Sequence, residues 1–192
     1  INQDLANKIN LNFYEVIVTP KISKASLRIL KSRKKLIIID SIRLKEKNNN
    51  NFKSVNSGVL YQSFNSYKIS RSTIKLVSDK KSSKKIIDDM IFAYKVAKHV
   101  KSNAIVFANN KQTLGIGAGQ MSRLDSTRIA IMKYKDFFKN KNFVCASDAF
   151  FPFTDNIQKL LKLKCDAIIQ PSGSINDNKI INYAKKHKTS LY

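Results

Sequence analysis

Glycine, proline, cysteine and tryptophan are scarce: the 192 residues include 5 glycines, 3 prolines, 2 cysteines and no tryptophan. Glycine and proline at this level exclude collagen-like and low-complexity sequence. No apolar run approaches the length of about 18 residues that a transmembrane helix needs. Cys145 and Cys165 lie in apolar stretches, so we expect buried thiols, no disulfide framework and a cytoplasmic protein.

Acidic residues are also scarce. The sequence has 13 Asp and Glu residues against 36 Lys and Arg, which gives a formal net charge of +23. Such an excess usually indicates a polyanionic partner. Nucleic-acid readers favour arginine, yet only 6 of the basic residues are arginine and the lysines are spread along the whole chain. We therefore predict no specific nucleic-acid partner and no membrane partner. A basic nucleic-acid-binding module is the alternative.

The hydrophobic content of 43% is enough to bury a core. Apolar spacing predicts a strand at residues 14–20, a helix at 24–32 and a second strand at 35–40. Polar sequence follows from about residue 42 to residue 85, with brief extended runs at 58–62 and 72–77. This polar stretch is the expected boundary between two lobes.

Beyond residue 85 the periodic pattern returns. It predicts helices at 85–100, 122–132, from 155 and at 177–187, and extended segments at 104–108, 113–116, 143–146 and 167–170. Strands that alternate with helices of this length are typical of an α/β fold, in which helices cover both faces of a parallel or mixed sheet.

Ligands of open α/β sheets bind beyond the carboxyl ends of the strands, so the loops that follow strands are candidate sites. The first such loop, residues 115–123 (GIGAGQMSR), holds three of the five glycines and opens a helix. It fits either a plain tight turn or an anion site formed by backbone N–H groups. Arg123 favours the anion site, because an arginine fork stands here in a lysine-dominated chain.

The second loop, residues 147–156, places Phe150, Phe151 and Phe153 around a proline, with Asp148 and Asp155 at its two ends. An apolar wall framed by carboxylates suits a flat aromatic ligand that carries N–H donors. The alternative is a packed loop in which Asp155 only caps the next helix.

Two further segments are candidates because they lie at the ends of predicted strands. Residues 170–175 run from a strand into a Gly-Ser loop, and Asn103 lies between a helix and a strand with an amide that can donate and accept. The zinc deaminase motif and nucleophilic hydrolase motifs are absent from the sequence, so we expect neither a zinc site nor nucleophilic hydrolase chemistry from this chain.

Four runs carry a family resemblance: residues 95–108, 115–123, 146–156 and 169–177. They resemble, in order and spacing over about residues 91–192, the bifunctional purine biosynthesis proteins, whose C-terminal part is the AICAR (phosphoribosylaminoimidazolecarboxamide) formyltransferase. The preceding part of the chain resembles that family more loosely. The resemblance implies a three-layer, cytidine-deaminase-like α/β fold without zinc, and a homodimer with active sites at its interface. It also implies transfer of a formyl group from 10-formyltetrahydrofolate to the 5-amino group of AICAR during IMP synthesis.

The resemblance also implies roles for single residues. Asn103 matches a catalytic position that contacts the nucleotide and the formyl group, and Arg123 and Phe150 match nucleotide-binding positions. The folate side and a structural potassium ion are matched by a further set: Leu124, Asp155, Ser174 and Ile175 for folate, and Ser102 and Asp148 for potassium.

On this resemblance, residues 1–45 correspond to a remnant of the first formyltransferase lobe, 46–85 to an irregular connection with short strands, and 86–192 to a second lobe truncated at its C-terminus. The family's Lys-His pair, its C-terminal arginine-containing tail and its cyclohydrolase domain have no counterpart here. Thr154 and Asn176 stand where many members have arginine. We expect a fragment that is inactive alone. The alternative is a degenerate or structural lobe that folds and dimerises without binding folate.

Overall fold

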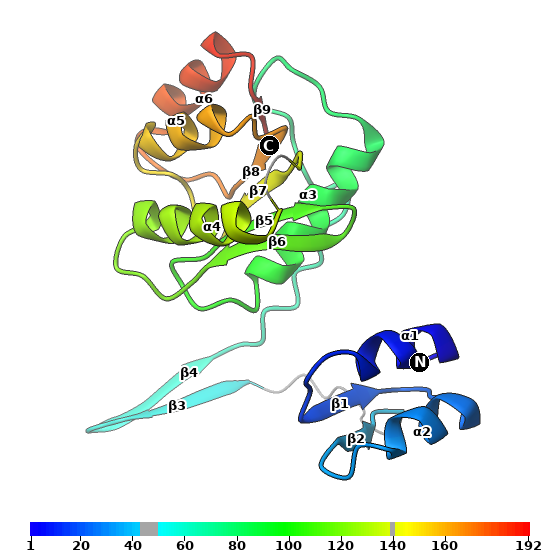
Figure 1. Ribbon diagram of the computed structural model, residues 1–192. Coiled ribbons are helices and arrows are strands. Elements are labelled where there is room, and N and C mark those ends of the chain that lie inside the picture. Colours follow the sequence, from blue (N-terminus) through cyan, green and yellow to red (C-terminus); the bar gives the residue numbers. More distant parts are fainter. Residues whose placement is uncertain (43–49, 139–140) are drawn as a thin grey trace. The chain divides into compact units, whose positions relative to one another are not determined.

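The computed structural model describes residues 1–42, 50–138 and 141–192. The chain divides into two compact units, Ile1–Ser66 and Tyr67–Tyr192, and this division falls within the polar stretch that separates the periodic segments of the sequence. The elements, labelled in Figure 1, are α1 (Gln3–Asn10), β1 (Val16–Thr19), α2 (Lys24–Lys31), β2 (Ile37–Asp40), β3 (Asn51–Val55), β4 (Gly58–Gln62), α3 (Lys84–Ala97), β5 (Ile105–Asn109), β6 (Gln112–Gly117), α4 (Arg123–Phe138), β7 (Val144–Ser147), α5 (Asp155–Lys162), β8 (Ala167–Ile169), α6 (Asp177–Lys186) and β9 (Ser190–Leu191).

After helix α1, the first unit contains a β-α-β arrangement that confirms the predicted strand, helix and strand. Strands β1 and β2 pair in parallel, with Val16 opposite Ile37. Ser23 caps α2 by accepting a hydrogen bond from the Ser26 N–H at 3.1 Å, and Leu30 of that helix is fully buried. The sequence analysis missed α1, a helix of 8 residues with a short apolar stripe.

Strands β3 and β4 form an antiparallel hairpin, so the extended run predicted at residues 58–62 is confirmed. The run predicted at residues 72–77 does not form a strand. A turn occupies residues 71–73, and beyond it Val77 donates its N–H to the Leu191 carbonyl at 2.9 Å. Leu191 in turn donates to the Ser78 hydroxyl at 2.8 Å. Isolated bonds of this kind cover the edge of β9 without a regular ladder.

The second unit is built on a mixed sheet of five strands in the order β6-β5-β7-β8-β9. Strand β5 runs antiparallel to β6 and β7, whereas β7, β8 and β9 are parallel to one another. Successive residues of β5 point to opposite faces: Ile105 and Phe107 join one buried cluster, and Val106 and Ala108 join another.

Helices cover both of these faces (Figure 1). Met90 and Ala93 of α3 pack in the cluster on one face. The cluster on the other face contains residues of α4, α5 and α6: Ala130, Tyr134, Ile157, Leu160, Ile180 and Ala184. The predicted α/β fold with a mixed sheet covered on both faces is therefore confirmed, and this unit has three layers. Its assignment to the cytidine-deaminase-like folds stays a prediction.

Helix α4 ends at Phe138, six residues later than the sequence analysis placed its end. The reason is Tyr134, which is only 4% exposed. Its ring lies 4.8 Å from the ring of Phe143 and 6.2 Å from that of Phe107, measured between centroids. These ring contacts stabilise the last turns of the helix. The sequence pattern does not indicate them, because charged residues flank Tyr134.

The glycines of the first loop serve helix packing. Gly115 and Gly117 lie in β6 beneath α4, and a Cβ atom at Gly117 would stand 1.8 Å from the Ser126 carbonyl oxygen. At Gly115 it would stand 2.3 Å from the Ala130 carbonyl oxygen. Gly115 thus lies in the extended segment that the sequence predicts at residues 113–116, and neither Gly115 nor Gly117 forms the tight turn that is one alternative for this loop. Of the three glycines in this loop, only Gly119 has a positive φ, +68°, at the bend into α4.

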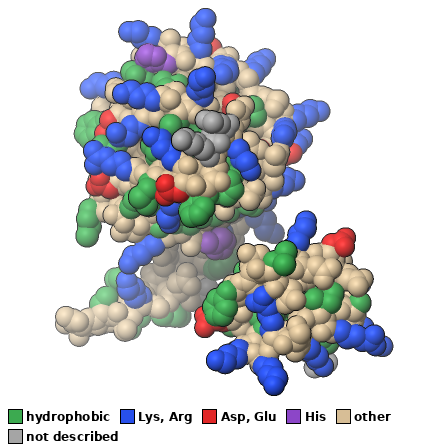
Figure 2. All heavy atoms as spheres, in the orientation of Figure 1, with side chains coloured by type: hydrophobic (Ala, Val, Ile, Leu, Met, Phe, Trp, Pro, Cys, Tyr) green, Lys and Arg blue, Asp and Glu red, His purple; other side chains and the backbone are tan. Residues whose placement is uncertain are grey.

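Both cysteines are buried and free, as expected. None of the described helices is long and apolar enough to cross a membrane. Figure 2 shows Lys and Arg side chains scattered over the face in view, with no single basic patch on that face.

We expect Gly117→Ala to destabilise the protein by about 3 kcal/mol, because the new methyl group collides with the backbone of α4. Gly58→Ala is the matched control, since nothing lies within 4 Å of a Cβ at that position. Thermal unfolding followed by circular dichroism measures both. Equal melting temperatures for the two variants would contradict the close packing of β6 against α4.

Candidate functional site

Strand register brings the candidate loops to one edge of the sheet. Ile105, at the start of β5, pairs with Gly117 at the end of β6 and with Ser147 at the end of β7. The segment before β5, the bend before α4 and the loop after β7 therefore meet at this edge. Asn103, Arg123 and residues 148–155 lie in these three places.

Arg123, the first residue of α4, links the three segments. One of its terminal nitrogens, Nη2, donates to Asn103 Oδ1 at 2.8 Å and to Asp148 Oδ1 at 3.1 Å. The other, Nη1, donates to the Phe150 carbonyl oxygen at 3.2 Å. The Arg123 and Asp148 side chains are only 12% and 14% exposed, so this ion pair is largely shielded from water.

Asp148 receives further hydrogen bonds from the segment before β5. Its Oδ1 accepts the Ala104 N–H at 3.0 Å, and its Oδ2 accepts the Ser102 hydroxyl. Burial raises the pKa of Asp148, but the bonds from Ser102, Ala104 and Arg123 outweigh burial and hold the pKa below its ordinary value. The carboxylate is thus stabilised in its charged form.

The Asn103 amide has a fixed orientation. Its Nδ2 donates to the carbonyl oxygens of Gln120 at 2.9 Å and Met121 at 3.1 Å, while its Oδ1 accepts from Arg123. Both N–H donors are used, and one acceptor position on Oδ1 remains.

A cavity of about 280 Å³ lies beside this network. Its lining residues are Asn103, Met121, Ser122, Arg123, Leu124, Pro152, Phe153, Asp155 and Asn156. The structure therefore brings together four of the predicted site residues, Asn103, Arg123, Leu124 and Asp155, although Leu124 and Asp155 come from different helices. The sequence analysis missed Ser122 and Asn156, whose small polar side chains carried no signal.

The remaining predicted residues lie outside this lining. Phe150 contributes its carbonyl oxygen to Arg123 and does not line the cavity. Ser174 and Ile175 do not line it either, and Ile175 is fully exposed.

The apolar wall differs from the one expected. Phe151 is fully buried in the core and cannot face a ligand. The wall of the cavity consists of Pro152 and Phe153, and Phe153 is 65% exposed.

Asp155 bonds to the start of α5 and also lines the cavity. It is the first residue of α5, and its Oδ1 accepts the Asn156 N–H at 2.7 Å, which satisfies a donor of the first helical turn. It also lines the cavity. Thr154, the residue before the helix, makes no side-chain capping bond.

The loop after β8 is tied to the loop after β7. Asn176 donates from Nδ2 to the Pro152 carbonyl at 3.0 Å, and Gln170 accepts the Phe151 N–H at 2.9 Å. Asn176 thus uses its amide to hold the wall of the cavity in place. Ser174 accepts the Asn176 N–H at 3.0 Å and supports the same link.

The residues expected near a potassium ion bond to each other and to Arg123, and the potassium site stays a prediction. The Ser102 hydroxyl donates to Asp148, and the Arg123 guanidinium lies 3.1 Å from an oxygen of the same carboxylate. A cation would have to displace these positively polarised donors. Within residues 1–42, 50–138 and 141–192, no three His, Cys, Asp or Glu side chains are grouped so as to hold a metal.

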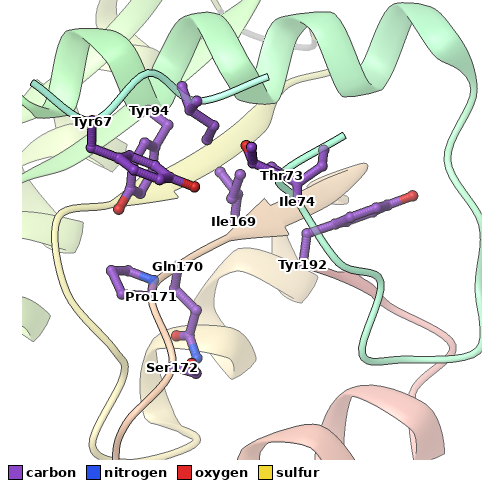
Figure 3. A pocket seen from close by; sticks show the side chains of 10 residues that line it. Tyr67, Thr73, Ile74, Tyr94, Ile169, Gln170, Pro171, Ser172 and Tyr192 are labelled. Carbon is purple, nitrogen blue, oxygen red and sulfur yellow. The ribbon is translucent and has the colours of Figure 1, made fainter. Parts of the chain in front are cut away.

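A second cavity, of about 350 Å³, lies at the end of β8 (Figure 3). Tyr67 and Tyr94 lie close together on one side of it, and Tyr192 lies on the other. Gln170, Pro171 and Ser172, from the segment 170–175 that follows β8, also line this cavity. None of these three residues lines the first cavity.

Comparison with known proteins identifies the family. The family model described as "AICARFT/IMPCHase bienzyme" matches residues 1–133. The chain belongs to this family. The match includes the N-terminal unit, where the resemblance in sequence was looser. The motifs at 146–156 and 169–177 lie beyond it.

Similar relatives are described as "Bifunctional purine biosynthesis protein PurH". That of Wigglesworthia glossinidia brevipalpis is 46% identical over 184 residues, which are 95% of this chain and 35% of the relative. That of Buchnera aphidicola subsp. Schizaphis graminum is 41% identical over 196 residues, which are 100% of this chain and 37% of the relative. The chain thus spans little more than a third of the AICARFT/IMPCHase relatives that it matches.

We expect Asp148→Asn to cost about 2 kcal/mol at pH 7, because the charged hydrogen bonds to Arg123, Ser102 and Ala104 weaken. The lowered pKa of Asp148 stabilises the folded protein at pH values above about 3.9, the ordinary pKa of Asp. This stabilisation is lost as the pH falls through the pKa of Asp148 in the folded protein. Urea unfolding should therefore show that the free energy of unfolding falls less between pH 7 and pH 3 in the variant than in the wild type.

Asp125→Asn is the control, since Asp125 forms an exposed ion pair with Arg128. If the free energy of unfolding falls equally between pH 7 and pH 3 in Asp148→Asn and in the wild type, the assigned role of Asp148 is contradicted.

Proposed function

We propose that this chain is part of the AICAR formyltransferase of its family, which transfers a formyl group from 10-formyltetrahydrofolate to AICAR. The observation that carries the proposal is the single cavity that gathers Asn103, Arg123, Leu124 and Asp155. These residues match the family's nucleotide and folate positions, and they come from separate segments of the chain. Their convergence supports one site for two substrates.

The nucleotide side of the proposal rests on Arg123. Its Nη1 and Nη2 are bonded within the protein, but its buried Nε–H has no acceptor among the described residues. A buried donor without a partner is costly, so an oxygen of a bound ligand or a water would stabilise it. A nucleotide supplies such oxygens on its phosphate and its carboxamide.

The folate side rests on Asp155 with Leu124, Pro152 and Phe153. A carboxylate beside apolar surfaces suits a flat heterocycle that presents N–H groups at one edge. A pterin ring has this form.

The geometry of Asn103 indicates its part in the reaction. The AICAR amine must attack the formyl carbon, lose a proton to a base, and displace N10 of the folate, which takes up a proton. Because both N–H groups of Asn103 are bonded within the protein, its free capacity is as an acceptor at Oδ1. We infer that it orients the amine, and that the oxyanion of the tetrahedral intermediate needs a donor from elsewhere.

The wider assignments belong to the same proposal. Residues 1–45 correspond to part of the first lobe, 46–85 to a connection and 86–192 to the second lobe. The protein acts as a cytoplasmic homodimer with no zinc in its catalytic site.

A structural lobe that does not bind folate is the second candidate. It is favoured by the bonds that Arg123 makes within the protein, and by Thr154 and Asn176 in place of arginines that could pair with ligand charges.

Calorimetry with folic acid and with AICAR separates the two candidates. We expect Asp155→Ala to weaken folic acid binding by about tenfold or more and to leave AICAR binding unchanged, and Arg123→Ala to abolish AICAR binding, because charged hydrogen bonds to a ligand are strong. Absence of binding by the folded wild-type chain favours the structural lobe.

A further inference from the structure

Two buried side chains beside the cavity form a hydrogen-bonded relay that ends at Asp155. Thr127 of α4 is fully buried, and Asn156 of α5 is 2% exposed. Thr127 Oγ1 lies 2.7 Å from Asn156 Oδ1. Asn156 Nδ2 lies 3.2 Å from Asp155 Oδ1, the same oxygen that accepts the Asn156 backbone N–H.

The amide of Asn156 has one favourable orientation in this relay. If its oxygen and nitrogen exchanged places, an acceptor oxygen would stand 3.2 Å from the Asp155 carboxylate oxygen. With Nδ2 directed at Asp155, Asn156 Oδ1 faces the Thr127 hydroxyl. That hydroxyl has one proton and two acceptors within reach, Asn156 Oδ1 at 2.7 Å and the Arg123 carbonyl oxygen at 3.0 Å, and the shorter distance favours donation to Asn156. Because Asn156 is almost fully buried, leaving its Oδ1 without this hydrogen-bond donor would be costly.

The relay therefore determines how the Asp155 carboxylate is presented. Both donors from Asn156 reach Oδ1, and among the described residues no donor is bonded to Oδ2. One oxygen is held by the protein and the other is left for a ligand. An aspartate at the start of a helix would otherwise sample several rotamers, and binding would have to immobilise it.

We propose that Thr127 and Asn156 are positioning residues that fix the Asp155 carboxylate for the N–H edge of a pterin ring. This inference rests on the proposed function, because it assumes that Asp155 binds folate. It adds Thr127, which does not line the cavity and acts only through Asn156 and Asp155, and Asn156, which lines the cavity and holds Asp155. It also links α4, which carries Arg123, to the folate side of the cavity.

The test compares two substitutions of one residue. Thr127→Val keeps the shape of the side chain and removes the hydroxyl, whereas Thr127→Ser keeps the hydroxyl. In calorimetry with folic acid, Thr127→Val should raise the Kd about three- to tenfold, the cost of immobilising a freed side chain. Thr127→Ser should remain within about twofold of the wild type. Asn156→Ala should match Thr127→Val, and the double variant should be no weaker than Asn156→Ala.

The matched control is Ile157→Val, which removes a buried methyl group from the next residue of α5 and leaves the relay intact. It should lower the melting temperature without changing the Kd. If Thr127→Val binds folic acid as the wild type does, while Asp155→Ala does not, the relay does not position Asp155.

Nuclear magnetic resonance reads the relay without a ligand. The side-chain NH₂ protons of Asn156 should exchange slowly with solvent in the wild type and in Thr127→Ser, and rapidly in Thr127→Val. If the wild type binds no folic acid, the proposed function fails, and this exchange still decides whether the relay exists. Rapid exchange in the wild type would overturn it.

Discussion

The ion pair between Arg123 and Asp148 is the interaction on which the site depends. It joins the start of α4 to the loop after β7, and Asn103 ties both to the segment before β5. A pair this well shielded is stable only if its remaining hydrogen-bonding groups find partners. Ser102, Ala104 and the Phe150 carbonyl provide most of them, so the loops of the candidate site are held by one shared network.

The sheet makes this network possible. Antiparallel pairing of β5 with β6 and β7 puts the start of one strand beside the ends of the other two. Gly115 and Gly117 then let α4 lie directly on β6, because any side chain at these positions would collide with the helix backbone. Arg123 reaches Asn103 and Asp148 as a result of this close approach.

Much of the fold could be predicted from the sequence because apolar periodicity is local, as in β1, α2 and the strands around Cys145. The end of α4 could not, since Tyr134 is buried by contacts outside its own helix, with Phe107 and Phe143. For the site, motifs pointed to Asn103, Arg123, Leu124 and Asp155, and the structure brings these together. Sequence alone could not separate Phe151, a core residue, from Phe153 at the cavity, and it gave no signal for the buried contact between Thr127 and Asn156.

The most direct test of the shared network is the affinity of Asp148→Asn for folic acid at pH 7, because Asp148 does not line the first cavity. If the ion pair holds the loops in place, the Kd should rise about tenfold in a variant that is still folded. An unchanged Kd in the folded variant would show that the cavity keeps its shape without Asp148, and would contradict the dependence of the site on this pair.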